Sequence, residues 1–269
     1  MSTEINDKRP VGILAGEGDL PLQLTRFCID NDIPVCVIQF KGCSYTDFPN
    51  IPILKTRIEK VGAIFSFLKK NKTANVVMIG NLRKPSLKTL RPDLKGLKTL
   101  SRIAGSFARG DDNLLRSLRN EIENEGYSVK GVDYYLHDLT ADAGCLTTAC
   151  SNIDFHDAIA ESLRYGAEDK GQSVLRHHDG TYAYETRDGT TALIQNECKN
   201  GSVLVKMVKP NQDPDLDRPT VGLETLKAIS ECGGAGIVIQ ANGVLMIDRA
   251  GMVAYANGHN LFIEVVVDG

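Results

Sequence analysis

The sequence predicts two α/β domains, because strand and helix patterns alternate along its first half and a different order of elements follows in its second half. In the first half, short apolar runs alternate with segments whose apolar residues recur at helical spacing. Between residues 140 and 155 this pattern weakens into small and polar residues. We therefore expect an N-terminal domain over residues 1–150 and a C-terminal domain over residues 151–269, a division that suits a chain of 269 residues.

The N-terminal half predicts a Rossmann-like parallel sheet with helices on both faces. Strands are expected at PVGILAG (10–16), IPVCVIQF (33–40) and ANVVMIGNL (74–82), and helices at 20–31 and 60–71. A further helix is expected to begin at Asp111 and to end before Gly126, because acidic residues favour helix starts and glycine commonly follows a helix end. A strand follows this helix.

The C-terminal half predicts a mixed α/β domain. Helical patterns occupy residues 154–171 and 223–234, and an apolar strand lies at 201–208. Residues 173–186 have the pattern of a hairpin around Asp179-Gly180, a pair that favours tight turns. Two more strands flank Asn242-Gly243, and a short helix and a strand at 261–267 complete the domain.

Composition and charge exclude several classes of protein. The formal net charge is −3, whereas nucleic-acid binders usually carry a basic excess, so we expect no nucleic-acid partner. No apolar stretch reaches the roughly 18–20 residues of a membrane-spanning helix, and the polar start is not that of a secretory signal. The seven cysteines are scattered, so we expect reduced thiols in a cytosolic protein rather than disulfides or a zinc site.

Two predicted strands run into loops that could bind a ligand. Gly16 and Gly18 lie in GILAGEGDLP (12–21), before a helix start whose backbone N–H groups could bind an anion. Asn81 and Arg83 lie in IGNLRKPSL (79–87), where arginine offers a planar fork for phosphate. Ligands of open α/β sheets usually bind at such strand ends. The alternatives are a tight turn that needs glycine and a basic surface loop. The glycine spacing is not G-x-G-x-x-G, which disfavours a dinucleotide-dependent oxidoreductase.

The acidic pair Asp111 and Asp112, in RGDDNLLR (109–116), is a third candidate for ligand binding. Acidic residues at a helix N-terminus also stabilise the helix through capping and the helix dipole. The sequence leaves both interpretations open.

The fourth candidate begins at Lys206, within the apolar run SVLVKMV. On a strand, Lys206 shares a face with Leu204 and Val208. A lysine on an apolar face either extends to the edge of the core or has an anionic partner. We therefore single out Lys206 as a candidate functional residue.

Three aspartates follow this strand, at positions 213, 215 and 217. Their alternation places them on one face of an extended chain. Their spacing is similar to the start of an EF-hand, but Arg218 stands where that loop needs glycine, which excludes a calcium hand. A Mg²⁺ site built from one or two carboxylates and a substrate phosphate remains open, as does a solvated charged turn.

Together, these stretches resemble the UDP-2,3-diacylglucosamine pyrophosphatase family of the LpxI type, which acts in lipid A synthesis. The resemblance covers almost the whole chain and rests on GILAGEGDLP, GNLRKPSL, GDDNLLR, GSVLVKMVKPNQD and DRPTVGLETL, in that order. The last two motifs are the most specific. The resemblance implies two α/β domains with the active site between them. It also implies Mg²⁺-dependent hydrolysis that yields UMP and 2,3-diacylglucosamine 1-phosphate.

The resemblance further implies roles for individual residues. Asp217 corresponds to the catalytic aspartate and Asp213 also matches the family pattern, so both are expected to bind Mg²⁺ or to orient the attacking water. Lys206 and Lys209 are expected to contact phosphate oxygens. Substrate-binding residues are expected at Gly16, Gly18, Asn81, Arg83, Asp111, Asp112, Gln212 and Thr220.

The implied substrate is a UDP-linked diacyl glucosamine lipid. The resemblance therefore implies a Gram-negative, cytoplasmic protein that contacts the inner membrane peripherally, and we include a homodimer among its expected partners. In RDGTTAL (187–193), however, Thr191 stands where the family usually has an aspartate. The alternative function is a catalytically impaired nucleotide- or lipid-binding protein on the same scaffold.

Overall fold

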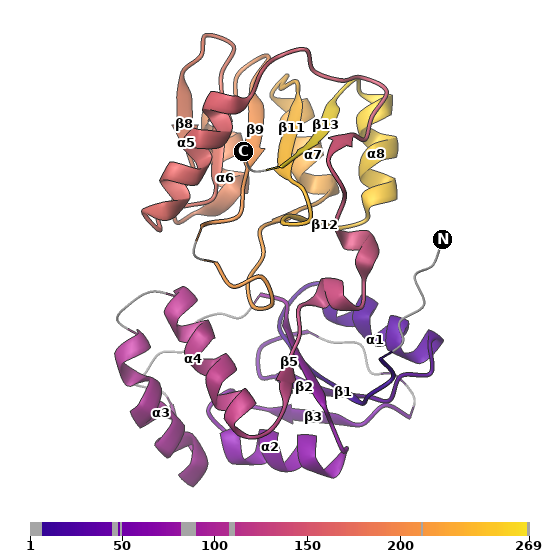
Figure 1. Cartoon of the computed structure of the whole chain (residues 1–269), viewed down its shortest axis with the longest axis vertical. Helices are drawn as coiled ribbons and strands as arrows, with labels where there is room; N and C mark the ends of the chain where they lie inside the picture. The colour runs from indigo at the N-terminus through magenta and orange to yellow at the C-terminus, as the bar shows by residue number, and fades with distance from the viewer. Residues whose placement is uncertain are drawn as a thin grey trace. The chain divides into compact units, whose positions relative to one another are not determined.

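The computed structural model describes residues 7–44, 48, 50–81, 90–107, 111–210 and 212–267. The chain folds into two compact units (Figure 1). Unit 1 comprises Met1–His137 and Asp215–Asp217, and unit 2 comprises Asp138–Pro214 and Arg218–Gly269. The division falls earlier than residue 150, because β6 (Gly144–Cys145) pairs with β13 (Phe262–Val266) in the sheet of unit 2.

Unit 1 contains the parallel sheet that the sequence predicted. Its strands are β1 (Val11–Ala15), β2 (Val35–Phe40), β3 (Ile53–Thr56), β4 (Asn75–Ile79) and β5 (Ser128–Val129). They pair in parallel in the order β3-β2-β1-β4-β5. The sequence did not predict β3, because this short edge strand is only partly buried and has no continuous apolar run.

Helices cover both faces of this sheet (Figure 1). They are α1 (Leu20–Asp30), α2 (Val61–Lys70), α3 (Leu94–Phe107) and α4 (Asp111–Asn124). Phe65 and Leu68 of α2 and Ile122 of α4 share a buried core with the strands. The sequence analysis did not predict α3, which packs against α2 and α4.

The backbones of β1 and β4 approach each other closely just beyond the ends of the strands. The Gly16 N–H donates to the carbonyl of Ile79 at 2.8 Å, and Glu17 and Asn81 exchange two backbone hydrogen bonds of 2.8 and 2.9 Å. A Cβ added to Gly16 would lie 2.7 Å from the carbonyl carbon of Gly80. Glycine at position 16 is therefore required by the packing of the two strand ends.

Unit 2 contains a mixed sheet with the strand order β6-β13-β11-β9-β7-β8. Its remaining strands are β7 (Ser173–Arg176), β8 (Tyr182–Tyr184), β9 (Val203–Lys206) and β11 (Gly236–Gln240). The central strands β9, β11 and β13 are parallel, whereas β6, β7 and β8 pair antiparallel. This arrangement confirms the predicted mixed α/β domain, including the β7–β8 hairpin.

A separate two-stranded sheet lies beside this sheet. It pairs β10 (Thr220–Val221) in parallel with β12 (Leu245–Met246). The two strands expected on either side of Asn242-Gly243 are therefore present, as β11 and β12, but they belong to different sheets. Asn242 has a φ of 53°, a left-handed conformation that asparagine tolerates in turns.

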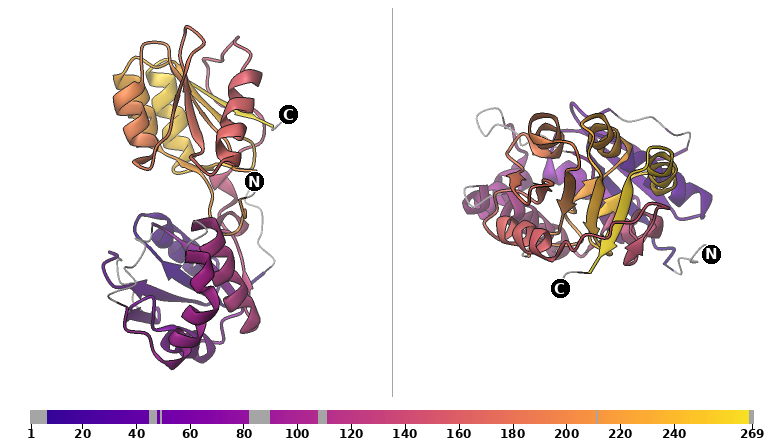
Figure 2. Two further views of the ribbon diagram at one scale, coloured as in Figure 1. Left: turned by 90° about the vertical axis from the view of Figure 1, so that its left-hand side faces the viewer. Right: turned by 90° about the horizontal axis from the view of Figure 1, so that it is seen from above.

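Helices cover both faces of the sheet of unit 2 (Figure 2). They are α5 (His156–Ala167) on one face and α6 (Gly189–Glu197), α7 (Leu223–Glu231) and α8 (Arg249–Gly258) on the other. The sequence did not predict α6, which is short and buries only Leu193 and Ile194 fully. None of the helices in the described part of the chain is long and apolar enough to span a membrane.

The expectation that all cysteines are reduced is wrong in this structure, which contains the disulfides Cys145–Cys150 and Cys198–Cys232. Cys198 and Cys232 directly follow α6 and α7. These helices pack together, which brings two cysteines separated by 34 positions in the sequence to a Cα–Cα distance of 5.9 Å. Helix packing therefore forms a pair that the sequence spacing did not reveal.

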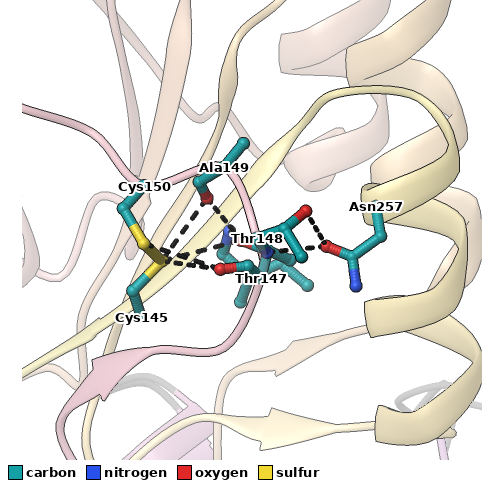
Figure 3. The surroundings of a disulfide bond; sticks show 7 residues. Cys145, Thr147, Thr148, Ala149, Cys150 and Asn257 are labelled. Carbon is teal, nitrogen blue, oxygen red and sulfur yellow. Dashed lines mark hydrogen bonds between the residues drawn. A yellow bond between two sulfur atoms is a disulfide. The ribbon is translucent and has the colours of Figure 1, made fainter.

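The Cys145–Cys150 disulfide closes a short loop that is hydrogen-bonded to β13 and to α8 (Figure 3). The Thr147 hydroxyl donates to the carbonyl of Ala149 at 2.7 Å and accepts the backbone N–H of Ile263 in β13 at 3.0 Å. The backbone N–H and the hydroxyl of Thr148 donate to Oδ1 of Asn257 in α8. These hydrogen bonds fix residues 145–150 to unit 2.

Replacement of Gly16 by alanine is expected to lower the free energy of unfolding by about 1–3 kcal/mol, the usual cost of forcing extra atoms into a packed site. The added methyl group would meet the Gly80 backbone, which cannot rotate away as a side chain can. Urea denaturation measures the difference. Gly258→Ala is the control, because a Cβ there meets no heavy atom within 4 Å among the described residues. Equal stability of the two variants would contradict the proposed close approach.

Thiol titration of unfolded protein, isolated without reductant, is expected to find three thiols, those of Cys28, Cys36 and Cys43. After reduction the same titration should find all seven. Seven thiols before reduction would show that both cysteine pairs are reduced in the isolated protein.

Candidate functional site

Lys206 is the last residue of β9 and lies inside the core of unit 2. Its neighbours across the sheet are Ser173 in β7 and Ile239 in β11. Leu204, two positions earlier, packs in the core beneath α6 and α7, so the predicted shared face of Leu204 and Lys206 is confirmed. Only 5% of Lys206 is exposed, although the residue carries an ammonium group.

The ammonium of Lys206 has hydrogen-bond acceptors from two other elements. Its Nζ donates to the Thr190 hydroxyl at 2.9 Å and to the Thr220 carbonyl at 3.1 Å. Thr190 lies in the first turn of α6, and Thr220 begins β10. The structure thus brings two predicted residues, Lys206 and Thr220, into direct contact.

A buried carboxylate lies one hydroxyl group away from this ammonium. Thr190 donates its hydroxyl hydrogen to Oε1 of Glu185, a residue that is 7% exposed and directly follows β8. The backbone N–H of Gln172 donates to the other oxygen of Glu185 at 2.8 Å. Glu185 is therefore an anionic partner for Lys206, linked to it through Thr190.

Sequence reasoning missed both Thr190 and Glu185. The signal was present in part, because a lysine in an apolar strand calls for an anion. The sequence contains 34 aspartates and glutamates, and none is marked as that anion by its spacing from Lys206.

The turn after β9 places the other predicted residues of the motif. The Lys209 ammonium donates to Asp169 Oδ1 at 2.7 Å. Gln212 is 8% exposed, and its backbone N–H donates to the Lys209 carbonyl at 2.9 Å. Asp213 follows and is half-buried. Lys209 therefore binds a carboxylate of unit 2 in this structure, whereas its predicted phosphate contact stays a prediction.

Asp215–Asp217 pack with unit 1. The Asp215 carboxylate accepts the backbone N–H of Gly131 at 3.0 Å and Arg119 Nη2 at 3.1 Å. Leu216 packs against the apolar core of the same unit. Asp217 comes next and is exposed. Asp215, which is not among the residues assigned to the site, is thus hydrogen-bonded within unit 1.

The two predicted metal ligands, Asp213 and Asp217, offer the carboxylate oxygens that Mg²⁺ prefers. No group of three or more histidine, cysteine, aspartate or glutamate side chains that could hold a metal occurs in the described part of the chain. A Mg²⁺ ion usually keeps several waters and binds through one or two carboxylates and substrate phosphates, so it does not require such a group. The residue types therefore fit a magnesium ion shared with a substrate.

A second group of predicted residues lies at the carboxyl edge of the unit 1 sheet. Gly16, Gly18 and Asn81 follow β1 and β4, the strands between which the strand order reverses. Ligands of open α/β sheets bind outside such a switch point. Gly18 has a φ of 110°, which glycine alone adopts readily, and Asn81 is exposed. Ligand binding by Gly16, Gly18 and Asn81 at this edge stays a prediction.

Cys43 lies near this edge. Burial, together with the nearby Glu17 carboxylate, raises the pKa of the Cys43 thiol. The thiol therefore stays protonated near neutral pH, which argues against a cysteine nucleophile at this position.

Three predicted residues fall outside what the structure describes. Arg83 belongs to the segment 82–89, which lies outside the described residues, as do the side chains of Asp111 and Asp112. The helix that these aspartates open does begin at Asp111, as expected. Thr191, the departure from the family motif, is exposed in the first turn of α6, next to Thr190.

Comparison with known proteins gives the family. The model of the LpxI N-terminal domain matches residues 10–139, and the model of the LpxI C-terminal domain matches residues 143–264. A Caulobacter vibrioides protein named UDP-2,3-diacylglucosamine pyrophosphatase LpxI is 29% identical over 270 residues, which cover 95% of this chain and 96% of that protein. With both domains matched in order and the expected folds present, the chain belongs to the LpxI family.

Proposed function

We propose that this protein hydrolyses the pyrophosphate bond of UDP-2,3-diacylglucosamine to UMP and 2,3-diacylglucosamine 1-phosphate. The observation that carries the proposal is the buried ammonium of Lys206 at the carboxyl end of β9, followed along the chain by Asp213 and Asp217. The printed name of the Caulobacter relative supports the choice of substrate. Hydrolysis of a diphosphate with a metal ion needs positive charge near the phosphate oxygens and carboxylates that can hold the metal, and this motif supplies both.

The reaction adds water across one phosphoanhydride bond. The water oxygen bonds to one phosphorus atom, the bridging P–O bond breaks, and the leaving phosphate keeps the bridging oxygen. Catalysis of such transfers comes mainly from positioning and from neutralising charge on the phosphate oxygens. We assign phosphate contacts to Lys206 and Lys209, and orientation of the attacking water to Asp217 with Asp213.

Mg²⁺ is the proposed cofactor. When bound, it would neutralise charge on the phosphate oxygens. Asp213 and Asp217 would hold it together with the substrate, since both offer carboxylate oxygens.

Nucleotide binding is assigned to the carboxyl edge of unit 1. Gly18 and Asn81 lie at the switch point of that sheet, where the backbone is accessible to a ligand. We also assign substrate binding to Arg83, Asp111 and Asp112, on the family motif alone. In unit 2 we assign substrate binding to Gln212 and Thr220.

The acyl chains of the substrate lie in a membrane, so the proposed reaction requires contact with a membrane surface. We propose peripheral contact with the cytoplasmic face of the inner membrane. Cytosolic proteins usually keep their thiols reduced. In that compartment the cysteines of each pair would be adjacent thiols, whereas the thiol titration described above concerns the protein after isolation without reductant.

Thr191 favours a second candidate function. It stands, exposed, where the family usually has an aspartate, next to the threonine that contacts Lys206. If that missing carboxylate is needed for turnover, the protein would bind the nucleotide lipid without hydrolysing it. Such a protein would retain the lipid through purification and release no UMP from it.

Purified protein is expected to release UMP from UDP-2,3-diacylglucosamine when Mg²⁺ is present and not when it is chelated. Asp217→Ala should lower turnover by about 100-fold or more, the scale on which loss of one transition-state contact acts. UMP release followed by chromatography measures both effects.

Asp30→Ala is the matched control, because Asp30 is an exposed aspartate at the end of α1. It should keep wild-type turnover. Near-full activity of Asp217→Ala would remove that residue from the mechanism. A folded wild-type protein that binds the lipid and releases no UMP, with or without Mg²⁺, would favour the binding function instead.

Asp215→Ala should act mainly on stability, in contrast to Asp217→Ala. It removes the acceptor of the Gly131 N–H and of Arg119, which we expect to lower the free energy of unfolding by about 1–2 kcal/mol. Urea denaturation of both variants tests this, and Asp217→Ala should show the smaller loss. The opposite ranking would mean that Asp217, not Asp215, anchors the loop.

A further inference from the structure

We propose that Glu185 and Thr190 are positioning residues for Lys206, holding its ammonium charged and fixed at the end of β9 through a hydroxyl-bridged ion pair. This inference rests on the proposed function for its effect on turnover. Its structural content, the control of Lys206 by a carboxylate two hydrogen bonds away, can be tested separately. Neither residue belongs to the motif that contains the predicted catalytic groups.

The bridge is built from three separate parts of unit 2. Lys206 ends β9, Thr190 lies in the first turn of α6, and Glu185 lies between β8 and α6. All three meet on the face of the sheet that α6 and α7 cover. The contact therefore depends on the packing of α6 against the sheet. A shift of α6 would move the Thr190 hydroxyl away from the ammonium of Lys206.

Counting hydrogens fixes the direction of each hydrogen bond. A threonine hydroxyl has one hydrogen to donate and two lone pairs to accept with. Lys206 can only donate to Thr190, at 2.9 Å, and the ionised Glu185 can only accept from it. The Ser173 hydroxyl, 3.2 Å from the Thr190 hydroxyl, must then donate to it as well. The Thr190 oxygen thus uses its full capacity and has one defined orientation.

Glu185 is itself held rigidly. One carboxylate oxygen accepts the Gln172 N–H at 2.8 Å and the other accepts from Thr190. The Glu185 carbonyl accepts the Tyr165 hydroxyl at 2.6 Å, and its N–H donates to the Ser173 carbonyl at 3.1 Å. Because both the backbone and the side chain of Glu185 are hydrogen-bonded, its carboxylate keeps a defined position relative to the ammonium of Lys206.

The energetic reason for the bridge is the cost of burying a charge. An isolated ammonium in the protein interior is strongly destabilised unless it is paired and hydrogen-bonded. Removing one partner of a buried pair leaves the other uncompensated. Without Glu185 or the Thr190 hydroxyl, the ammonium of Lys206 would be less well compensated, even with the Thr220 carbonyl in place, and it would shift toward water or hold its proton less firmly. In either case it would be displaced from the phosphate position that the proposed function gives it.

The variants follow from this geometry. Thr190→Val keeps the shape of the side chain and removes the hydroxyl, whereas Thr190→Ser keeps the hydroxyl. Glu185→Gln removes the charge and places an amide that can accept only one of the two donors that Glu185 now accepts. Thr181→Val is the matched control, because Thr181 is an exposed threonine in the β7–β8 turn.

Two readouts are measured on the full-length variants. The first is kcat and KM for UMP release. The second is the rate at which an amine-specific reagent modifies Lys206 in the folded protein, quantified by mass spectrometry with Lys209 as the internal reference. Modification requires an accessible, deprotonated amine, so it reports how firmly Lys206 is held.

We expect Thr190→Val and Glu185→Gln to lower kcat about 100-fold with KM little changed, as for loss of a transition-state contact. Both should increase the modification of Lys206 several-fold. Thr190→Ser and Thr181→Val should resemble the wild type in both readouts. Rescue by serine separates the hydroxyl from a merely structural effect of the site. If Thr190→Val does not fold, Glu185→Gln decides.

Wild-type modification rates for Lys206 in both Thr190→Val and Glu185→Gln would overturn the inference, even if turnover fell. Equal loss of turnover in Thr190→Ser and Thr190→Val would also overturn it. If the wild type shows no turnover at all, the proposed function fails, and the modification rates alone decide whether Glu185 and Thr190 hold Lys206.

Discussion

The buried positive charge of Lys206 constrains the elements of unit 2 that meet at the end of β9. A strand in the centre of a mixed sheet ends in an ammonium that is almost entirely removed from water. Such a charge is tolerated only when acceptors surround it. The Thr190 hydroxyl, the Thr220 carbonyl and, behind Thr190, Glu185 supply this environment. The positions of α6 and β10 are thereby tied to the end of β9.

The loop after β9 connects this buried charge to unit 1. Residues Asp215–Asp217 pack with the first unit, although the chain before and after them belongs to the second. Asp215 provides the polar anchor and Leu216 the apolar one. The three alternating aspartates that suggested a metal site therefore do not share one role. One carboxylate holds the loop, while the two beside it remain the proposed ligands of Mg²⁺.

Glycine is needed at Gly16 and at Gly18 for two different structural reasons, which the sequence alone did not distinguish. Gly16 is required because the backbone of Gly80 occupies the space of its missing side chain. Gly18 has a backbone conformation that other residues adopt rarely. Both lie at the edge expected to bind the nucleotide, but the close approach at Gly16 serves the pairing of β1 and β4. The glycine at position 16 is therefore explained by strand packing and does not by itself indicate a bound ligand.

The sequence by itself determined the two α/β domains, most of the central strands and helices, and the family. These features rest on local periodicity, turn residues and motifs, which are readable along the chain. Only the tertiary structure decided that Glu185 and Thr190 serve Lys206, that Asp215 anchors to unit 1 and that Cys198 meets Cys232. The edge strand β3 and the short helix α6 were also seen only in the tertiary structure, because their hydrophobic patterns in the sequence are too weak to predict them. The physical reason is that a partner across a core is selected by packing between distant segments, and no spacing in the sequence records that choice.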